Sequence, residues 1–330
     1  MDWHDKEVLI TGGTGSLGKT LTKLLLSQQQ RPKGIRIFSR DELKQWEMRI
    51  EIKNDYAKSH GLKRSIKDSE IPVSYLIGNV QDRKRMEMAN KGVDILIHCA
   101  ALKQVPACED NPLEAIKTNV IGAQNILYSA LENKIEKVLA ISTDKAVMPI
   151  NLYGGTKLCA EKLFINGNVY SGGRKPRFSC IRYGNVLGSR GSVVPLFRKQ
   201  FKENGRVTIT DPNMTRFWIK LEIVAAFVLS CVEKMNGGEI FIPKMGSSKI
   251  TTLLEAIIPQ PCKIEYTGIR PGEKLHEILI TEGESKRISE YSDHYVIAGE
   301  EQKGLTPFEY RSDNNHVKLT TEDIKGMISE

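Results

Sequence analysis

In the first half of the chain, short apolar runs alternate with longer segments in which apolar residues recur at helical spacing. Short apolar runs at 7–10, 34–38, 73–77, 93–99, 137–142 and 177–182 predict strands. The segments between them at 16–28, 42–57, 113–132 and 153–164 predict helices, and the leucines of the first helix recur at helical spacing. Strands that alternate with helices favour a parallel sheet covered on both faces, which is a doubly wound α/β fold.

After residue 184 the alternation becomes less regular. Residues 221–234 predict a helix and 239–243 a short strand, and Arg270-Pro-Gly-Glu273 is expected to break the chain before another helix. The charged segment 53–72 has no clear period and is expected to be an insertion or a solvated loop. We therefore expect a sheet domain of residues 1–184 plus 217–247, and a smaller C-terminal lobe of residues 185–216 plus 248–330 that binds the substrate.

Composition narrows the class of protein. Hydrophobic residues make up 40% and charged residues 27% of the 330 residues, which is typical of a soluble globular protein. No apolar run reaches the roughly 20 residues of a membrane span, and the polar N-terminus does not resemble a secretory signal, so a cytoplasmic protein is expected.

The six cysteines form no C-x-x-C pair or zinc pattern, so no metal site is predicted. The net charge of +8 favours an anionic ligand such as a nucleotide diphosphate, and no nucleic-acid motif accompanies it.

A glycine-rich loop follows the first predicted strand. Gly12, Gly15 and Gly18 lie between that strand and the next helix, with Thr14, Ser16 and Leu17 among them. Glycine permits a tight turn and close approach of the backbone to phosphate, and the helix N-terminus offers N–H groups to a pyrophosphate. The context is the one that the dinucleotide fingerprint requires.

The end of the second strand bears on which dinucleotide is bound. An acidic residue at this point binds the ribose hydroxyls of NAD, whereas a hydroxyl followed by arginine suits the 2′-phosphate of NADP. The sequence has Ser39-Arg40-Asp41 here, with Lys44 close by. We favour NADP, and Asp41 keeps NAD open.

A second group of polar residues surrounds the end of the fifth strand. Thr143 ends that strand, and Tyr153 and Lys157 share one face of the following helix because they are four residues apart. A nearby ammonium favours the phenolate, so Tyr153 could exchange a proton with an alcohol. Together with the glycine loop, this pattern predicts redox chemistry on a hydroxyl group.

At this point the sequence resembles the extended short-chain dehydrogenase/reductase family, which has a Rossmann domain. Within that family it is similar to the inverting UDP-N-acetylglucosamine 4,6-dehydratases of pseudaminic acid biosynthesis. The resemblance covers nearly the whole chain and is carried by the strings at 38–45, 100–106, 142–153, 182–193, 214–218 and 269–277.

The resemblance implies a lyase whose cofactor is regenerated in each turnover. Tyr153 would take the proton of the C4 hydroxyl while NADP⁺ accepts the C4 hydride. Lys145 would then remove the C5 proton and Asp144 would protonate the departing C6 hydroxyl, with Thr143 and Lys157 as the other catalytic residues. Return of the hydride to C6 and reprotonation of C5 from the opposite face would give UDP-2-acetamido-2,6-dideoxy-β-L-arabino-hex-4-ulose. A lysine base needs a lowered pKa, which requires burial or a neighbouring cation.

Further binding residues are assigned by the same resemblance. The expected cofactor set adds Asn79, Val80, Cys99, Lys103 and Val186 to the residues of the glycine loop and to Ser39, Arg40, Lys44, Tyr153 and Lys157. The expected set for UDP-N-acetylglucosamine is Lys103, Asn185, Arg190, Arg216, Arg270 and Glu273. Packing or surface roles are expected for His98 and His276, and a homo-oligomer such as a hexamer is implied.

Some positions depart from the family pattern, and other functions stay open. Met148 stands where the family usually has Asn, and Gly155 where it has Ala. A UDP-sugar 4-epimerase would use the same Tyr and Lys without the Asp-Lys pair. A retaining dehydratase of the membrane-attached type would have Met in place of Tyr153, and a protein that only senses a dinucleotide would not need the catalytic residues.

Overall fold

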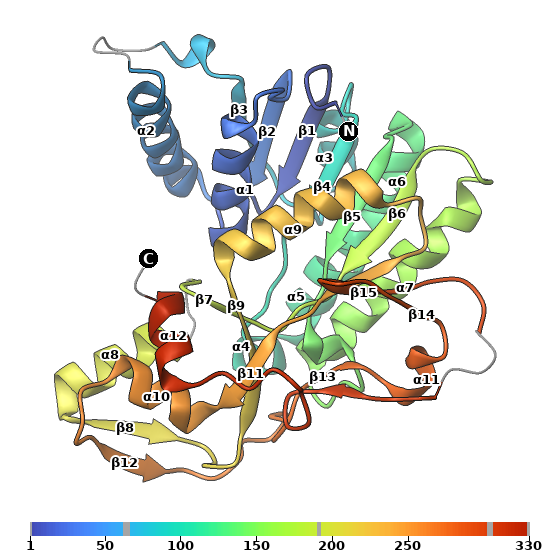
Figure 1. The fold of residues 1–330 in the computed structure, drawn as a ribbon. Coiled ribbons are helices and arrows are strands. Elements are labelled where there is room, and N and C mark those ends of the chain that lie inside the picture. The colour runs from blue at the N-terminus through green and yellow to red at the C-terminus, as the bar shows by residue number, and fades with distance from the viewer. Residues whose placement is uncertain (1, 62–66, 190–192, 302–305, 329–330) are drawn as a thin grey trace.

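The computed structural model describes residues 2–61, 67–189, 193–301 and 306–328. Its central feature is a nine-stranded sheet in the order β14-β15-β10-β6-β5-β4-β1-β2-β3 (Figure 1). Seven neighbouring strands are parallel: β3 (Val73–Ile77), β2 (Gly34–Ser39), β1 (Glu7–Thr11), β4 (Ile95–His98), β5 (Lys137–Ile141), β6 (Arg177–Ile181) and β10 (Ile240–Pro243). The predicted doubly wound α/β fold is therefore confirmed.

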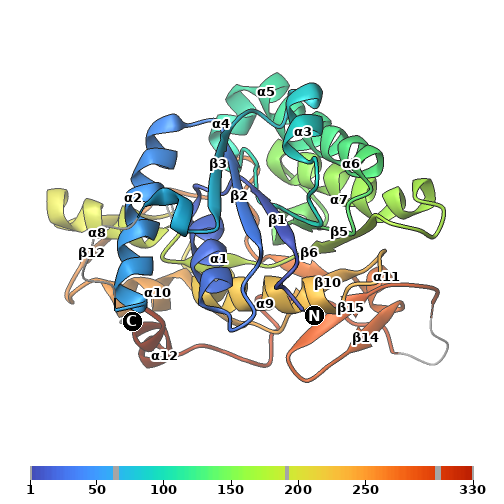
Figure 2. The same ribbon diagram turned by 90° about the horizontal axis from the view of Figure 1, so that it is seen from above.

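Helices cover both faces of this sheet, as Figure 2 shows from above. One face carries α1 (Ser16–Ser27) and α9 (Leu221–Lys234), and the other carries α3 (Arg83–Ala89), α6 (Gly122–Asn133) and α7 (Leu152–Tyr170). The strands bury both of their faces, as the four fully buried residues of β4 illustrate. This two-sided burial explains why they read as continuous apolar runs.

The predicted helix at 113–132 is confirmed with one irregularity. It begins as α5 (Pro112–Ile116), passes through a π-helical turn (Lys117–Ile121) and continues as α6, after the short helix α4 (Val105–Asp110). A π turn inserts an extra residue and often lies at a functional site. Thr118 of this turn lines the cavity described below.

The segment 53–72 is not simply a loop, because α2 (Glu42–Ser59) continues through its first part. Met48, Ile52 and Tyr56 are buried at helical spacing, and the charged residues that hid this pattern lie on the outer face. A 3-10 turn (Asp68–Glu70) precedes β3. The expectation of an insertion or loop was therefore wrong for residues 53–59.

The range predicted for the smaller lobe contains small sheets and short helices in its described residues. The sheets pair β7 (Asn185–Leu187), β9 (Thr215–Lys220) and β11 (Gly246–Lys249); β8 (Arg206–Ile209) with β12 (Lys263–Tyr266); and β13 (Ile278–Ile280) with β16 (Tyr310–Arg311). The helices are α8 (Val193–Asn204), α10 (Ile250–Ile257), α11 (Glu282–Ser285) and α12 (Thr321–Ile328). Residues of α8, α10 and β8, with Trp218, form a hydrophobic cluster separate from the main core.

The C-terminal part also contributes to the main sheet. The antiparallel strands β14 (Ile288–Glu290) and β15 (His294–Ile297) extend it beyond β10, although they fall within the range predicted for the smaller lobe. The division of the chain into the two predicted domains stays a prediction.

The helix expected after Arg270–Glu273 is absent from this described stretch, where an irregular segment leads into β13. The reason is that backbone carbonyls which would accept hydrogen bonds within a helix accept them here from other segments. Those of Lys274 and Leu275 accept hydrogen bonds from the guanidinium of Arg216, and Leu275 also accepts one from the N–H of Thr215. Tertiary contacts therefore override the local tendency of this segment.

Candidate active site

A cavity of about 830 Å³ opens at the carboxyl ends of the parallel strands. This is where ligands bind in open α/β sheets. Every residue predicted to bind the cofactor lines it: Gly12, Thr14, Gly15, Ser16, Leu17, Gly18, Ser39, Arg40, Lys44, Asn79, Val80, Cys99, Lys103, Tyr153, Lys157 and Val186. Their contact with a cofactor remains a prediction, but the fold brings all of them to one place.

The glycine loop has the geometry of a phosphate cradle. Gly12 has a φ of +64°, and a Cβ there would come within 2.8 Å of the backbone of Ala100, so this turn requires glycine. Gly18 packs against Gly13, where a Cβ would lie 2.4 Å from a backbone oxygen. Helix α1 begins directly after Gly15 without a side-chain cap, so its N-terminal dipole faces the cavity.

Asp41 and Arg40 follow strand β2 and have different contacts. Asp41 caps helix α2 by accepting a hydrogen bond from the backbone N–H of Lys44, at 3.0 Å. Its carboxylate also pairs with the ammonium of Lys44 at 2.7 Å, and these contacts hold the pKa of Asp41 below its usual value. Ser39 accepts a hydrogen bond from Gln45, while the exposed Arg40 borders the cavity. Asp41 is therefore engaged in capping the helix.

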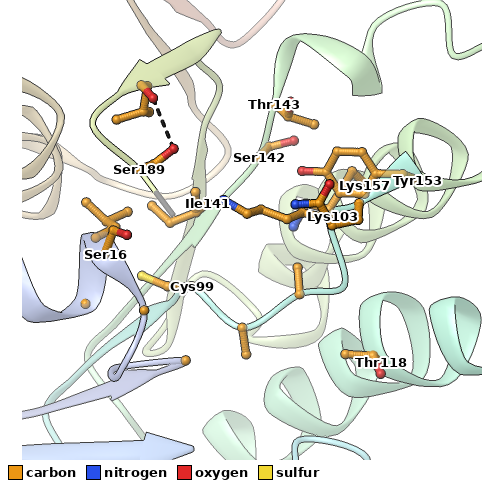
Figure 3. Close-up of a pocket in the computed structure, with 18 of the residues that line it drawn as sticks. Ser16, Cys99, Lys103, Thr118, Ile141, Ser142, Thr143, Tyr153, Lys157 and Ser189 are labelled. Carbon is orange, nitrogen blue, oxygen red and sulfur yellow. Dashed lines mark hydrogen bonds between the residues drawn. The ribbon is translucent and has the colours of Figure 1, made fainter. Parts of the chain in front are cut away.

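Tyr153 and Lys157 lie side by side on α7 and face the cavity, near Ser142 and Thr143 (Figure 3). The side chain of Lys157 is almost fully buried and makes no hydrogen bond or ion pair within the described parts of the chain. Burial lowers its pKa, and nearby Glu161 acts in the opposite direction. A buried ammonium without a partner is costly unless a ligand supplies one. The cradle and this ammonium together fit a nicotinamide dinucleotide.

The hydroxyl of Tyr153 is a neutral phenol in this state. Burial raises its pKa to about 12, although the charge of Lys145 and the hydroxyl of Thr143 act to lower it. The sequence-based expectation was that a neighbouring ammonium favours the phenolate. The cation that acts in that direction is Lys145 and not the Lys157 of the expectation, and in the protein alone burial outweighs it.

Asp144 and Lys145 form a 3-10 turn (Asp144–Ala146) immediately after β5. The ammonium of Lys145 is 3.0 Å from Oδ1 of Asp144, and the hydroxyl of Thr143 donates to the same oxygen at 2.9 Å. Asp144 is fully buried, while Lys145 is 24% exposed and lines the cavity. A carboxyl group and an amino group are thus in direct contact beside Tyr153.

The predicted substrate residues do not all have the same surroundings. Lys103 and Asn185 line the cavity, and Oδ1 of Asn185 is buried without a hydrogen-bond partner in the described chain. Arg270 is exposed, and Arg190 lies outside the described residues. The assignment of these four to the substrate stays a prediction.

Arg216 and Glu273 form a contact of their own at 3.7 Å. The guanidinium of Arg216 is buried and donates to the backbone carbonyls of Thr215, Lys274 and Leu275. These bonds fix the segment that precedes β13 to strand β9. The structure therefore gives Arg216 a clear structural role, and its contact with substrate stays a prediction.

Three polar side chains near this centre were not predicted. Ser142 lines the cavity, and its buried hydroxyl has no hydrogen-bond partner among the described residues. Glu277 and Lys274 lie next to Lys145 and Arg216. All three belong to the strings that carry the family resemblance, and that membership was the one available signal for them.

The two histidines have the packing roles expected of them. His98 is buried and shares a 2.7 Å hydrogen bond with Thr11, and burial, followed by the charge of Lys157, lowers its pKa to about 3. His276 is half-buried and lies 2.8 Å from the hydroxyl of Thr215. Neither residue lies among those that line the cavity in the described chain.

Comparison with known proteins places the chain in a family. The pattern described as polysaccharide biosynthesis protein matches residues 8–299. The chain belongs to that family. Its nine-stranded α/β architecture is that of an extended short-chain dehydrogenase/reductase. No helix of the described residues is long and apolar enough to cross a membrane.

Named relatives refine this membership. The chain is 47% identical to a UDP-N-acetylglucosamine 4,6-dehydratase (inverting) of Campylobacter jejuni, over 99% of this chain and 98% of the other. It is also 39% identical to a UDP-glucose 4-epimerase of Rickettsia bellii, over 98% and 95%. The resemblance to the inverting dehydratases is thus confirmed, and the higher identity lies on the dehydratase side.

Solved structures agree with this fold. The X-ray structure of Pen from Bacillus thuringiensis has a TM-score of 0.89 at 37% identity and covers 100% of this chain and 99% of the other. DesIV, a dTDP-glucose 4,6-dehydratase from Streptomyces venezuelae with NAD and TYD bound, has a TM-score of 0.68. At 17% identity, over 82% and 86% of the two chains, it supports the fold alone.

Proposed function

We propose that the protein is a UDP-N-acetylglucosamine 4,6-dehydratase that inverts C5 and uses a bound NADP regenerated in each turnover. The observation that carries the proposal is the contact of Asp144 with Lys145 at the end of β5, beside Tyr153 and the dinucleotide cavity. The proposal is further supported by the 47% identity to the Campylobacter jejuni dehydratase over 99% of this chain.

The residues of this centre match three of the four proton transfers that the reaction needs, and the fourth is the reprotonation of C5 from the opposite face. Tyr153 takes the proton of the C4 hydroxyl, with Thr143 close to the same oxygen. Lys145 removes the C5 proton, which the C4 ketone has made acidic, and Asp144 protonates the departing C6 hydroxyl. Bound NADP⁺ supplies the oxidation at C4 and the hydride that reduces C6. Because the redox steps cancel, the net reaction is loss of water.

The choice of NADP follows from the end of β2. Asp41 caps helix α2 and pairs with Lys44, so its carboxylate is held by the helix. Ser39 and Arg40 border the cavity together with Asp41, and arginine binds a 2′-phosphate through its fork of N–H donors. We expect the nucleotide released from purified protein on denaturation to be NADP, identified by its mass, and recovery of NAD alone would contradict this choice.

A UDP-sugar 4-epimerase is the second candidate, favoured by the 39% identity to the Rickettsia bellii epimerase. An epimerase needs Tyr153, Lys157 and the cofactor but has no use for an acid and a base at C5 and C6. The two functions therefore differ in the fate of C6.

Proton NMR of the reaction with UDP-N-acetylglucosamine in D₂O, without added cofactor, separates the candidates. We expect a new C6 methyl signal, deuterium at C5 and the L-arabino configuration. A product that keeps its C6 hydroxyl would eliminate the dehydratase, and an unchanged C5 configuration would eliminate the inversion. Replacement of Lys145 by Met should abolish the methyl signal while the nucleotide stays bound.

We also infer a homo-oligomer in the cytoplasm that supplies pseudaminic acid biosynthesis. The oligomer and the pathway rest on the family resemblance, and the compartment rests on the polar N-terminus and the lack of a long apolar run in the sequence. Light scattering of the purified protein tests the first, and a monomer would contradict it.

A further inference from the structure

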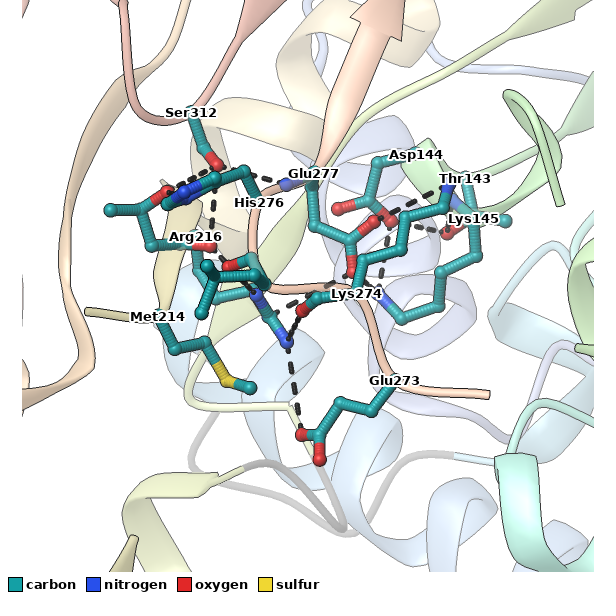
Figure 4. A network of polar contacts seen from close by, with 12 residues as sticks. Thr143, Asp144, Lys145, Met214, Arg216, Glu273, Lys274, His276, Glu277 and Ser312 are labelled. Carbon is teal, nitrogen blue, oxygen red and sulfur yellow. Dashed lines mark hydrogen bonds and ion pairs between the residues drawn. The ribbon is translucent and has the colours of Figure 1, made fainter. Parts of the chain in front are cut away.

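A buried carboxylate outside the predicted catalytic set lies beside Lys145. Glu277 directly precedes β13, and its side chain is only 2% exposed. Its Oε1 lies 3.4 Å from the ammonium of Lys145, which also contacts Asp144 (Figure 4). Lys145 therefore contacts two carboxyl groups that come from segments more than 130 residues apart.

Within the described chain, the carboxyl group of Glu277 has cations around it and no side-chain hydrogen bond. Arg216 is 3.8 Å from its Oε1 and Lys274 is 3.8 Å from its Oε2, and Oε2 has no hydrogen-bond partner in the described chain. Burying a carboxylate without hydrogen bonds is costly unless cations surround it. Three cations from three segments do so here, which makes Glu277 the shared anion of the cluster.

The state of Lys145 in this cluster differs from the one that its chemistry needs. Burial and Arg216 disfavour the ammonium, but the attraction of Asp144 and Glu277 is stronger, so the pKa of Lys145 lies above its usual value. A base at C5 must be a neutral amine, and an acid at C6 must be protonated. Transfer of one proton from Lys145 to Asp144 breaks an N–H bond, forms an O–H bond and produces both groups at once.

We propose that Glu277 is a positioning residue that sets the proton balance between Lys145 and Asp144. Its negative charge favours the ammonium of Lys145, and it therefore opposes the transfer to Asp144. The cations of Arg216 and Lys274 partly neutralise that charge, and so they favour the transfer. This proposal rests on the proposed function, because the pair acts on substrate only in a dehydratase.

Removing Glu277 or its neutralising cation should shift the balance in opposite directions. In Glu277→Gln, Lys145 loses an anion at 3.4 Å, and its pKa should fall by about 1–3 units. In Lys274→Met, the charge of Glu277 is less neutralised and a repelling cation is lost, so the pKa of Lys145 should rise. The other charged or titratable groups around the pair stay in place: Asp144, Tyr153, Arg216, Glu273 and His276.

Competitive labelling of amines over a range of pH, read by mass spectrometry of the peptide that carries Lys145, measures that pKa in the purified protein. It does not depend on catalysis, and the 24% exposure of Lys145 makes the amine accessible. The pH profile of kcat for loss of water from UDP-N-acetylglucosamine is the second measurement. We expect its acidic limb to move to lower pH in Glu277→Gln and to higher pH in Lys274→Met.

Two further variants serve as controls. Glu277→Asp keeps the charge and should restore most of the wild-type profile. Glu290→Gln removes the carboxylate of an exposed pair with Lys244 and should leave the pKa of Lys145 unchanged.

Equal values for the pKa of Lys145 in wild type and Glu277→Gln would overturn the proposal, even if kcat falls. If Glu277→Gln does not fold, Lys274→Met carries the same test alone, and an unchanged pKa there is equally negative. Failure of the proposed function looks different. In that case the pKa of Lys145 shifts as expected, but wild-type protein yields no C6-deoxy sugar.

Discussion

The buried ion cluster around Arg182 should contribute strongly to the stability of the catalytic helix. Arg182 follows β6, and its guanidinium is 1% exposed. It donates two hydrogen bonds to Glu161 of α7, two to Glu284 of α11 and one to the carbonyl of Leu279. Glu161 lies one turn beyond Lys157 on the same helix, so the cluster fixes the helix that presents Tyr153 and Lys157.

The variant Arg182→Met removes the shared cation and keeps most of the side-chain volume. Two carboxylates then lose their partner, and the 2% exposure of Glu161 keeps water from replacing it. Breaking a buried pair in this way typically costs about 3–5 kcal/mol, because an uncompensated charge is left behind. We expect a loss of that size in the free energy of unfolding at pH 7.

The loss should depend on pH with a defined sign. Burial raises the pKa of Glu284, but the charge and hydrogen bonds of Arg182 lower it more, so its pKa lies below the ordinary value of 4.5. A lowered pKa contributes stability above the unfolded-state pKa, and this contribution disappears as the pH falls through the folded-state value. The difference between wild type and Arg182→Met should therefore be full at pH 7 and should shrink below about pH 4.5.

Urea unfolding followed by far-UV circular dichroism at pH 7 and at pH 4 measures these differences. The double variant Arg182→Met/Glu161→Gln should recover part of the stability, because it removes the buried charge as well. Arg83→Met, which breaks an exposed pair with Glu87 and Glu132, should leave stability unchanged. A loss below about 1 kcal/mol in Arg182→Met, or one that grows as the pH falls, would refute the reasoning.

Three further changes test the cofactor site and one strained residue. Arg40→Ala should weaken binding of NADP about tenfold or more and leave NAD binding unchanged, because the 2′-phosphate loses its cation. Fluorescence titration measures both affinities, and equal losses for the two nucleotides would contradict this expectation. Lys157→Met should fold, by circular dichroism, but purify without nucleotide absorbance, since we propose that the buried ammonium is a main contact of the cofactor; retained nucleotide argues against that contact. Met148→Asn should raise the free energy of unfolding by about 1 kcal/mol, because Met148 has a φ of +43° that Asn adopts more easily; a decrease in calorimetry would be inconsistent with strain there.

The sheet could be predicted because each of its first six strands stands alone as an apolar run between helices. Local periodicity is enough for that pattern, since crossover connections then determine the parallel order. The smaller lobe could not be predicted in the same way. Its strands are as short as Tyr310–Arg311, too short to show a period, and pairs such as β8 with β12 join residues more than 50 positions apart. Such strands form because they pair with distant strands, and the local sequence does not indicate that pairing.

The same distinction applies to the candidate site. Thr143, Asp144 and Lys145 are adjacent in the chain, so one strand end brings them together and a motif can identify them. Glu277 meets Lys145 only through the fold, and its residue type alone indicates no role.

The sequence also could not tell which charged side chains are available to a ligand. Arg216 and Lys157 are both cations of the predicted site, yet one is held by three backbone carbonyls and the other has no partner in the described chain. A buried donor that already has hydrogen-bond acceptors in the protein gains little free energy from a ligand. A buried donor without acceptors has lost its water and gains a partner only when a ligand binds, so it contributes more to affinity. On this argument Lys157 should contribute more to ligand affinity than Arg216, and replacing Arg216 should first disrupt the segment that carries Glu277.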